Sequence, residues 1–219
     1  MTTPAHGSPW PDDLVRVFLS HSAVHKQFAG EVAQHLREVG VYGFVAHDTM
    51  TVSLPWQDQI EDALRTAEVL VALIHPEFND SAWCQQEIGW ALGRGIPVFC
   101  IRIGRDPQGF AGRTQWPSAY DQKPDEVART INGWLNSQPS LSDRITGGLI
   151  KALAQAGSYF EGEAAAKGLD AVGTLTSDQW EAVDSIVRTN DQVGGSILAR
   201  RALSPLYYRA DRDLPKYTG

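Results

Sequence analysis

The sequence predicts a doubly wound α/β domain, in which helices cover both faces of a parallel sheet, followed by a helical C-terminal extension. Short apolar segments that resemble buried strands alternate with segments in which apolar residues recur at helical spacing. The strand segments are apolar on both faces, which is typical of parallel sheets. With 219 residues, the chain is long enough for one such domain and an extension.

The first strand is expected at 14–19, where β-branched and aromatic residues precede the polar Ser20-His21-Ser22. The next helix, capped by Ser22 and ended by Gly40, has an apolar face made of Val24, Phe28, Val32 and Leu36. Three further strands are expected at 41–46, 69–74 and 96–103. A helix follows each of them. The first is marked by Trp56, Ile60, Leu64 and Ala67, the second by Cys84, Ile88, Ala91 and Leu92, and the third is expected at 123–136.

The character of the sequence changes after Pro139. A helical stretch at 141–156 leads into a segment rich in glycine and alanine, and Thr176 with Gln179 matches a capping box that starts a final helix at Ser177. The predicted regions are a disordered or loosely packed N-terminal segment at 1–13, a main domain at 14–136 and a helical extension at 137–219.

Composition narrows the function classes. The longest apolar run, Val69–Ile74, is too short to cross a bilayer, and the N-terminal residues do not resemble a secretion signal. Two cysteines cannot form a disulfide framework, so we expect a cytoplasmic protein with buried thiols.

Charge is unevenly distributed along the chain. The last 22 residues carry a charge of +3 and the rest −10. The acidic body would repel a nucleic acid, and the short apolar runs exclude a membrane span, so neither is expected as a partner. The basic end should contact acidic residues of its own chain or stay solvated.

Known nucleotide loops and nucleophile motifs are not found, and the pair His21 and His25 lacks a third metal ligand. The segment 79–87 is more informative. A cap at its start places Trp83 in the first turn of a helix and Glu87 one turn later on the same face, beside the core stripe rather than in it. The alternative is that Trp83 and Trp90 extend the packing and Glu87 is an ordinary solvated helix residue.

Several segments together resemble a TIR (Toll/interleukin-1 receptor-like) domain, which has a flavodoxin-like fold. The matching segments are Val-Phe-Leu-Ser-His-Ser at 17–22, His47-Asp48 through Pro55-Trp56 to Leu64, Ser81-x-Trp83-Cys84-x-x-Glu87, and Ile96-Pro97-Val98. The resemblance covers about 14–136 and is to bacterial NAD-cleaving members, in particular stand-alone anti-phage proteins of the Thoeris type. One departure is Val52-Ser53-Leu54-Pro55, where family members often carry glycine.

The resemblance implies an NAD+ nucleosidase or ADP-ribosyl cyclase with Glu87 as its catalytic residue. NAD+ would be the substrate, giving nicotinamide and either ADP-ribose or a cyclic isomer, and neither a cofactor nor a metal is expected. The implied partners are further copies of the chain, bound through the loops, and an effector protein reached through the nucleotide product in anti-phage defence. The implied substrate-binding residues are Leu19, Ser20, His21, Asp48, Trp56 and Trp83.

Other interpretations remain open. TIR domains also act as assembly or adaptor modules without catalysis, and such a module need not keep Glu87. A nucleoside deoxyribosyltransferase-like enzyme would also place a carboxylate near a sugar. For Trp56, packing of its loop is as good an explanation as substrate contact, and a hydrogen bond to backbone is the simpler role for His21.

Overall fold

The computed structural model describes residues 10, 14–46, 56–172 and 174–219. The chain divides into two compact units, which are considered separately below. The first includes Arg16–Leu36 and Tyr42–Ile131, and the second includes Arg37–Val41 and Asn132–Gly219.

The first unit is built on a four-stranded parallel sheet in the order β2-β1-β3-β4. Its strands are β1 (Val15–Ser20), β2 (Val41–Phe44), β3 (Val69–Ile74) and β4 (Val98–Arg102). Leu19 pairs with Val71 between β1 and β3, and Ala72 pairs with Cys100 between β3 and β4. All six residues of β3 are buried, as the apolar run predicts. The predicted fold class is confirmed.

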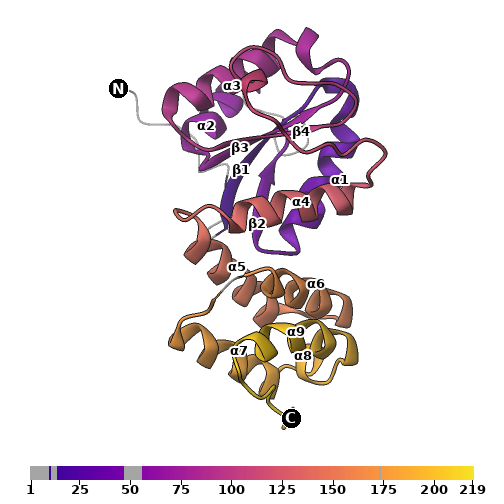
Figure 1. Ribbon diagram of the computed structural model, residues 1–219, viewed down its shortest axis with the longest axis vertical. Helices are drawn as coiled ribbons and strands as arrows, with labels where there is room; N and C mark the ends of the chain where they lie inside the picture. The colour runs from indigo at the N-terminus through magenta and orange to yellow at the C-terminus, as the bar shows by residue number, and fades with distance from the viewer. Residues whose placement is uncertain (1–9, 11–13, 47–55, 173) are drawn as a thin grey trace. The chain divides into compact units, whose positions relative to one another are not determined.

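Helices cover both faces of this sheet, with α2 and α3 on one side and α1 and α4 on the other (Figure 1). The helices are α1 (Lys26–Arg37), α2 (Trp56–Thr66), α3 (Ala82–Arg94) and α4 (Pro124–Asn136), with short 3-10 turns η1 (Ala23–His25), η2 (Phe78–Asp80) and η3 (Ala111–Arg113). The turn η3 lies in the long glycine-containing connection that follows β4.

Three details of the predicted helices are wrong. Val24 is 72% exposed, because residues 23–25 form η1 and the α-helical period begins only at Lys26. For the same reason Ser22 precedes a 3-10 turn, and its side chain makes no cap hydrogen bond. Leu92 is 41% exposed, because the buried stripe of α3 runs through Glu87 instead.

Trp10 is packed although it lies within the segment 1–13 that is expected to be loose. Its side chain is 5% exposed, it meets the rings of Tyr42 and Phe44, and its indole N–H donates to Thr66 Oγ1 at 2.7 Å. At this residue the expectation is therefore wrong, because an indole with an apolar body and a satisfied donor is well suited to burial.

The second unit is helical. Its elements are α5 (Ser142–Gln155), α6 (Tyr159–Asp170), α7 (Ser177–Thr189), α8 (Asp191–Gly194) and α9 (Ile197–Arg209). The capping box of Thr176 and Gln179 is present and α7 begins at Ser177, but α7 is not the final helix because α8 and α9 follow. Within the described ranges, no helix has the length and apolar character to span a membrane.

The segment rich in glycine and alanine is the helix α6, and its small residues allow other backbone segments to approach closely. A Cβ atom added at Gly162 would lie 2.6 Å from the carbonyl oxygen of Gln192, and one added at Gly168 would lie 2.4 Å from a methyl carbon of Leu149. At Gly162 the close atom is backbone, so a larger side chain does not fit there, whereas at Gly168 the Leu149 side chain would have to shift. The unusual composition of α6 thus reflects packing.

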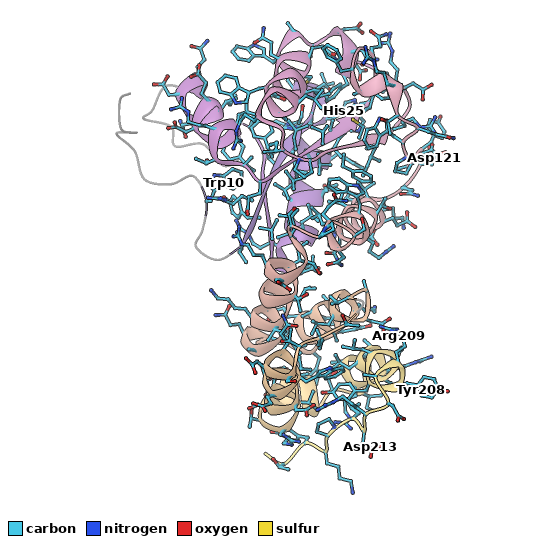
Figure 2. All side chains as sticks on the ribbon, turned by 60° about the vertical axis from the view of Figure 1, so that its left-hand side comes forward. Trp10, His25, Asp121, Tyr208, Arg209 and Asp213 are labelled. Carbon is cyan, nitrogen blue, oxygen red and sulfur yellow. The ribbon has the colours of Figure 1, made fainter. Side chains whose placement is uncertain are left out.

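The basic C-terminal residues contact acidic residues of the same unit. Arg209 pairs with Asp170 at 2.8 Å and Arg212 pairs with Asp184 at 2.9 Å, while the Arg212 guanidinium also stacks over Trp180. Tyr208, which precedes Arg209, is exposed and points away from the helices (Figure 2). The expected contact of this end with acidic residues of its own chain is confirmed.

We predict that Gly162→Ala destabilises the protein by about 1 to 3 kcal/mol, because the added methyl group meets the backbone oxygen of Gln192. The matched control is Gly147→Ala in α5, where an added Cβ has no neighbour within 4 Å and replacement should stabilise by about 0.5 to 1 kcal/mol. Thermal unfolding followed by circular dichroism measures both. Equal shifts for the two variants would refute the packing role of Gly162.

Candidate functional site

The polar residues at the end of β1 lie at the carboxyl edge of the sheet, where β1 and β3 are neighbours. From these two neighbouring strands the chain continues to opposite sides of the sheet, from β1 to β2 and from β3 to β4. Open α/β sheets bind their ligands at such a point. Ser20, His21 and Ser22 are all buried at this edge. The helix α3 packs against them, since the Cys84 thiol donates to the carbonyl oxygen of His21 at 3.4 Å.

Glu87 of α3 reaches the end of β1. The Ser20 hydroxyl donates a hydrogen bond of 2.5 Å to Glu87 Oε2, and the Glu87 side chain is 6% exposed. Burial raises the pKa of Glu87 to about 7, and the bond from Ser20 opposes this rise. A carboxyl group that exchanges its proton near neutral pH, at the ligand edge of the sheet, is the distinctive chemical feature of this site.

Trp83 precedes Glu87 by one turn of α3 but has a different environment. Its side chain is 44% exposed, whereas Glu87 is buried with Cys84 and Ile88. The expectation that Glu87 stays outside the core is therefore wrong. Residues four apart on a helix differ by about 40° in direction, and this rotation separates a buried residue from an exposed one at the edge of the packed face. The serine at the end of β1 supplies the polar partner that makes this burial possible.

The imidazole ring of His21 is hydrogen-bonded to the backbone of Leu19. The Nδ1–H of His21 donates to the carbonyl oxygen of Leu19 at 2.8 Å, and the Leu19 side chain is fully buried. This bond fixes the orientation of the imidazole ring and assigns the proton to Nδ1 in the neutral ring. The alternative role weighed for His21, a loop histidine bonded to backbone, matches this geometry.

The structure adds a pair of histidines that sequence reasoning missed. The rings of His25 and His75 stack at a centroid distance of 3.7 Å, and His25 Nε2 lies 2.9 Å from Glu77 Oε2. Burial, together with a smaller effect of the neighbouring His25, lowers the pKa of His75 to about 4, and the hydrogen bond from His25 lowers the pKa of Glu77. The available signal was the position of His75 directly after β3, equivalent to that of His21 after β1.

Three contacts hold the loop that leads into α3. Arg105 donates to the carbonyl oxygen of Pro76 at 2.7 Å and to Asp80 at 3.2 Å, and Asn79 donates to the carbonyl oxygen of Asp106 at 2.9 Å. The helix itself begins after Ser81, whose hydroxyl accepts from the N–H of Cys84, and it ends at Gly95 with a φ of 70°. The residues after β4 therefore help to set the position of Glu87.

Two predicted site residues are not placed. Asp48 lies outside the described residues, and of Trp56 the structure gives only its backbone as the first residue of α2. The structure thus brings Ser20 and Glu87 into direct contact and places His21 beside α3. Within the described part of the chain, no cluster of three or more His, Cys, Asp or Glu side chains is arranged to hold a metal ion.

A parallel sheet in this strand order, with its polar site between β1 and β3, defines a flavodoxin-like α/β protein. Within that class, the family described as TIR domain matches residues 17–131, which is more than half of the sequence. The chain belongs to the TIR domain family.

A solved structure with a similar fold is the TIR domain of the Toll-related Receptor TRR-2 from the lower metazoan Hydra magnipapillata. It is 15% identical to this chain, the similarity covers 53% of this chain and 90% of that one, and the TM-score is 0.42. A comparison with curated proteins found no match.

We predict that Glu87→Gln makes the protein more stable above pH 8 by about 3 kcal/mol, with no difference below about pH 4. The folded chain keeps the Glu87 proton up to about pH 7, whereas the unfolded chain releases it near 4.5. The stability of the wild type therefore falls as the pH rises between these values, while glutamine carries no charge and still accepts from Ser20. Urea unfolding across this pH range measures the difference.

The control for this prediction is Glu77→Gln. The pKa of Glu77 is lowered in the folded chain, so ionised Glu77 adds stability above its unfolded pKa and the variant should gain none at high pH. Parallel stability curves for the wild type and Glu87→Gln would show that Glu87 titrates normally.

Proposed function

We propose that this TIR domain cleaves the bond between nicotinamide and ribose in NAD+, with Glu87 as the catalytic carboxylate. The observation that carries the proposal is the buried pair of Ser20 and Glu87 at the carboxyl edge of the sheet. Family membership supports it in general terms, since TIR domains include NAD-cleaving enzymes as well as adaptors that lack catalysis.

The reaction needs little besides one well-placed carboxylate. Nicotinamide in NAD+ is already cationic and leaves as a neutral molecule, so no acid has to protonate it. Its departure leaves oxocarbenium character on the ribose, which a nearby carboxylate stabilises. In this proposal a ribose hydroxyl takes the place of the Ser20 hydroxyl as hydrogen-bond donor to Glu87, and the exposed indole of Trp83 stacks on a ring of the substrate.

The ribosyl cation then reacts with water to give ADP-ribose, or with an atom of the same nucleotide to give a cyclic isomer. A dry site favours the cyclic product. We propose that this product serves as an immune signal in bacterial anti-phage defence and reaches a separate effector protein. Self-association through the TIR loops would complete the active assembly.

A second candidate function is that of an assembly module. The observation that favours it is the exposure of two tryptophans on one face of α3, since Trp83 is 44% and Trp90 39% exposed. Such side chains are typical of the anchors of protein interfaces. The two candidates differ in their dependence on Glu87, because assembly through an exposed face does not require a buried carboxyl group.

We expect Glu87→Ala to reduce nicotinamide release from NAD+ at least about 100-fold, because it removes the charge that stabilises the transition state. Chromatography of the nucleotide products after incubation with NAD+ measures the loss and separates ADP-ribose from cyclic isomers. Glu77→Ala, which removes an exposed carboxylate near the same sheet edge, should retain activity. Full turnover by Glu87→Ala would remove this residue from the mechanism, and cleavage of nucleosides but not NAD+ would favour a deoxyribosyltransferase-like enzyme.

The pH dependence gives a second test. The active form of Glu87 is ionised, so kcat/KM should rise with pH and level off above about pH 7. Ser20→Ala removes the hydrogen bond that lowers the pKa of Glu87, and we expect the midpoint of the profile to move to higher pH. Initial rates measured between about pH 5 and pH 9 give both midpoints. A profile that falls as the pH rises would mean that protonated Glu87 acts as an acid.

A further inference from the structure

A separate pocket lies where β4 ends. Its volume is about 270 Å³, and Arg102, Gly104, Arg105, Asp106, Ser118 and Tyr120 line it. Neither Ser20 nor Glu87 contributes to this pocket. Two guanidinium groups and two hydroxyl groups in one hollow are the donors that proteins use to bind phosphate.

Both arginines retain donors that can face a ligand. Arg102 uses Nε for the carbonyl oxygen of Trp116 and Nη1 for Asp106. Arg105 uses only Nη1, for Pro76 and Asp80. Within the described parts of the chain, Nη2 of Arg102 and both Nε and Nη2 of Arg105 make no hydrogen bond, so several N–H groups remain for an anion.

Backbone hydrogen bonds hold the walls of the pocket in place. The N–H of Arg102 donates to the carbonyl oxygen of Pro117 at 3.0 Å, and the N–H of Ala119 donates to the carbonyl oxygen of Arg102 at 2.8 Å. These bonds fix Ser118 opposite Arg102. Gly104 has a φ of 111° and turns the chain between Arg102 and Arg105. A site with fixed donors loses little entropy when it binds.

The acidic partners of the two arginines do not block the pocket. The side chains of Asp106 and Asp80 are 78% and 74% exposed, and ion pairs of such exposed groups contribute little. A doubly charged phosphate group competes well with each of them. The ring of Tyr120 is exposed beside the pocket, next to Asp121 at the outer edge of the unit (Figure 2).

We propose that this pocket binds the phosphate group of a small phosphorylated molecule, with Arg102 and Arg105 as its anion-binding residues. Ser118 and Tyr120 supply hydroxyl donors. Arg105 also donates hydrogen bonds to Pro76 and Asp80 in the loop before α3. A ligand held by Arg105 would therefore be connected, through this side chain, to the loop that positions Glu87. The test of anion binding requires no NAD+ cleavage, so the two proposals can fail separately.

The test is isothermal titration calorimetry of the full chain with inorganic pyrophosphate, in buffer free of other phosphate. We expect saturable binding that weakens as sodium chloride is added, and an affinity about tenfold lower in Arg105→Gln, which loses a charge-assisted hydrogen bond. The matched control is Arg129→Gln in α4, which removes an arginine that is also paired with an aspartate but lies outside the pocket. Its affinity should equal that of the wild type.

Asp106→Asn provides a variant with the opposite expected effect. It removes the carboxylate that competes for Arg102, and we expect pyrophosphate to bind several-fold more tightly. A loss of binding through misfolding cannot produce this gain. No heat of binding in the wild type at millimolar pyrophosphate, or an equal loss of affinity in Arg105→Gln and Arg129→Gln, would overturn the proposal.

Discussion

The hydrogen bond between Ser20 and Glu87 connects the two parts of the chain that build the site. Ser20 ends β1 and Glu87 lies in the middle of α3, and the bond of 2.5 Å is buried beneath that helix. Without a polar partner, a carboxyl group at this depth would have to remain neutral or move to solvent. The strand order brings the partner into place, since β1 and β3 are adjacent and α3 is the α-helix that follows β3, after the turn η2. The sheet topology thus permits an acid to be buried at the point where a ligand would meet it.

The same edge of the sheet holds a second group of polar side chains under the same constraint. His75 is buried, stacks on His25 and keeps a low pKa, so it stays uncharged at neutral pH. Glu87 and His75 are therefore two titratable groups that burial shifts in opposite directions, one towards the neutral acid and the other towards the neutral base. Such opposed shifts are a common feature of functional sites in proteins. The stability lost by burying ionisable groups is consistent with a site kept for function.

The sequence was most informative where period and composition agree. The six apolar residues of β3 predicted a buried strand, and Thr176 with Gln179 predicted the start of α7, because each signal is local. The depth of Glu87 could not be predicted, since a rotation of about 40° decides it and depends on how α3 packs on the sheet. The pocket around Arg102 and Arg105 was equally hidden, because it arises from a loop whose course is set by distant backbone bonds. The helix α6 was missed because glycine weakens helix propensity, and only its close neighbours explain that composition.

Cys84 gives this protein a reporter placed next to the candidate site. Its thiol donates to the carbonyl oxygen of His21, and burial raises its pKa to about 11. The other cysteine, Cys100, lies in β4 with a pKa raised to about 12, and both thiols are buried and free. The thiolate is the form that attacks an alkylating reagent, so both thiols should react slowly in the folded domain. Any motion that separates α3 from the end of β1 would expose Cys84 while Cys100 stays within the sheet. The relative labelling rates of the two thiols therefore follow the opening of the site without an added probe.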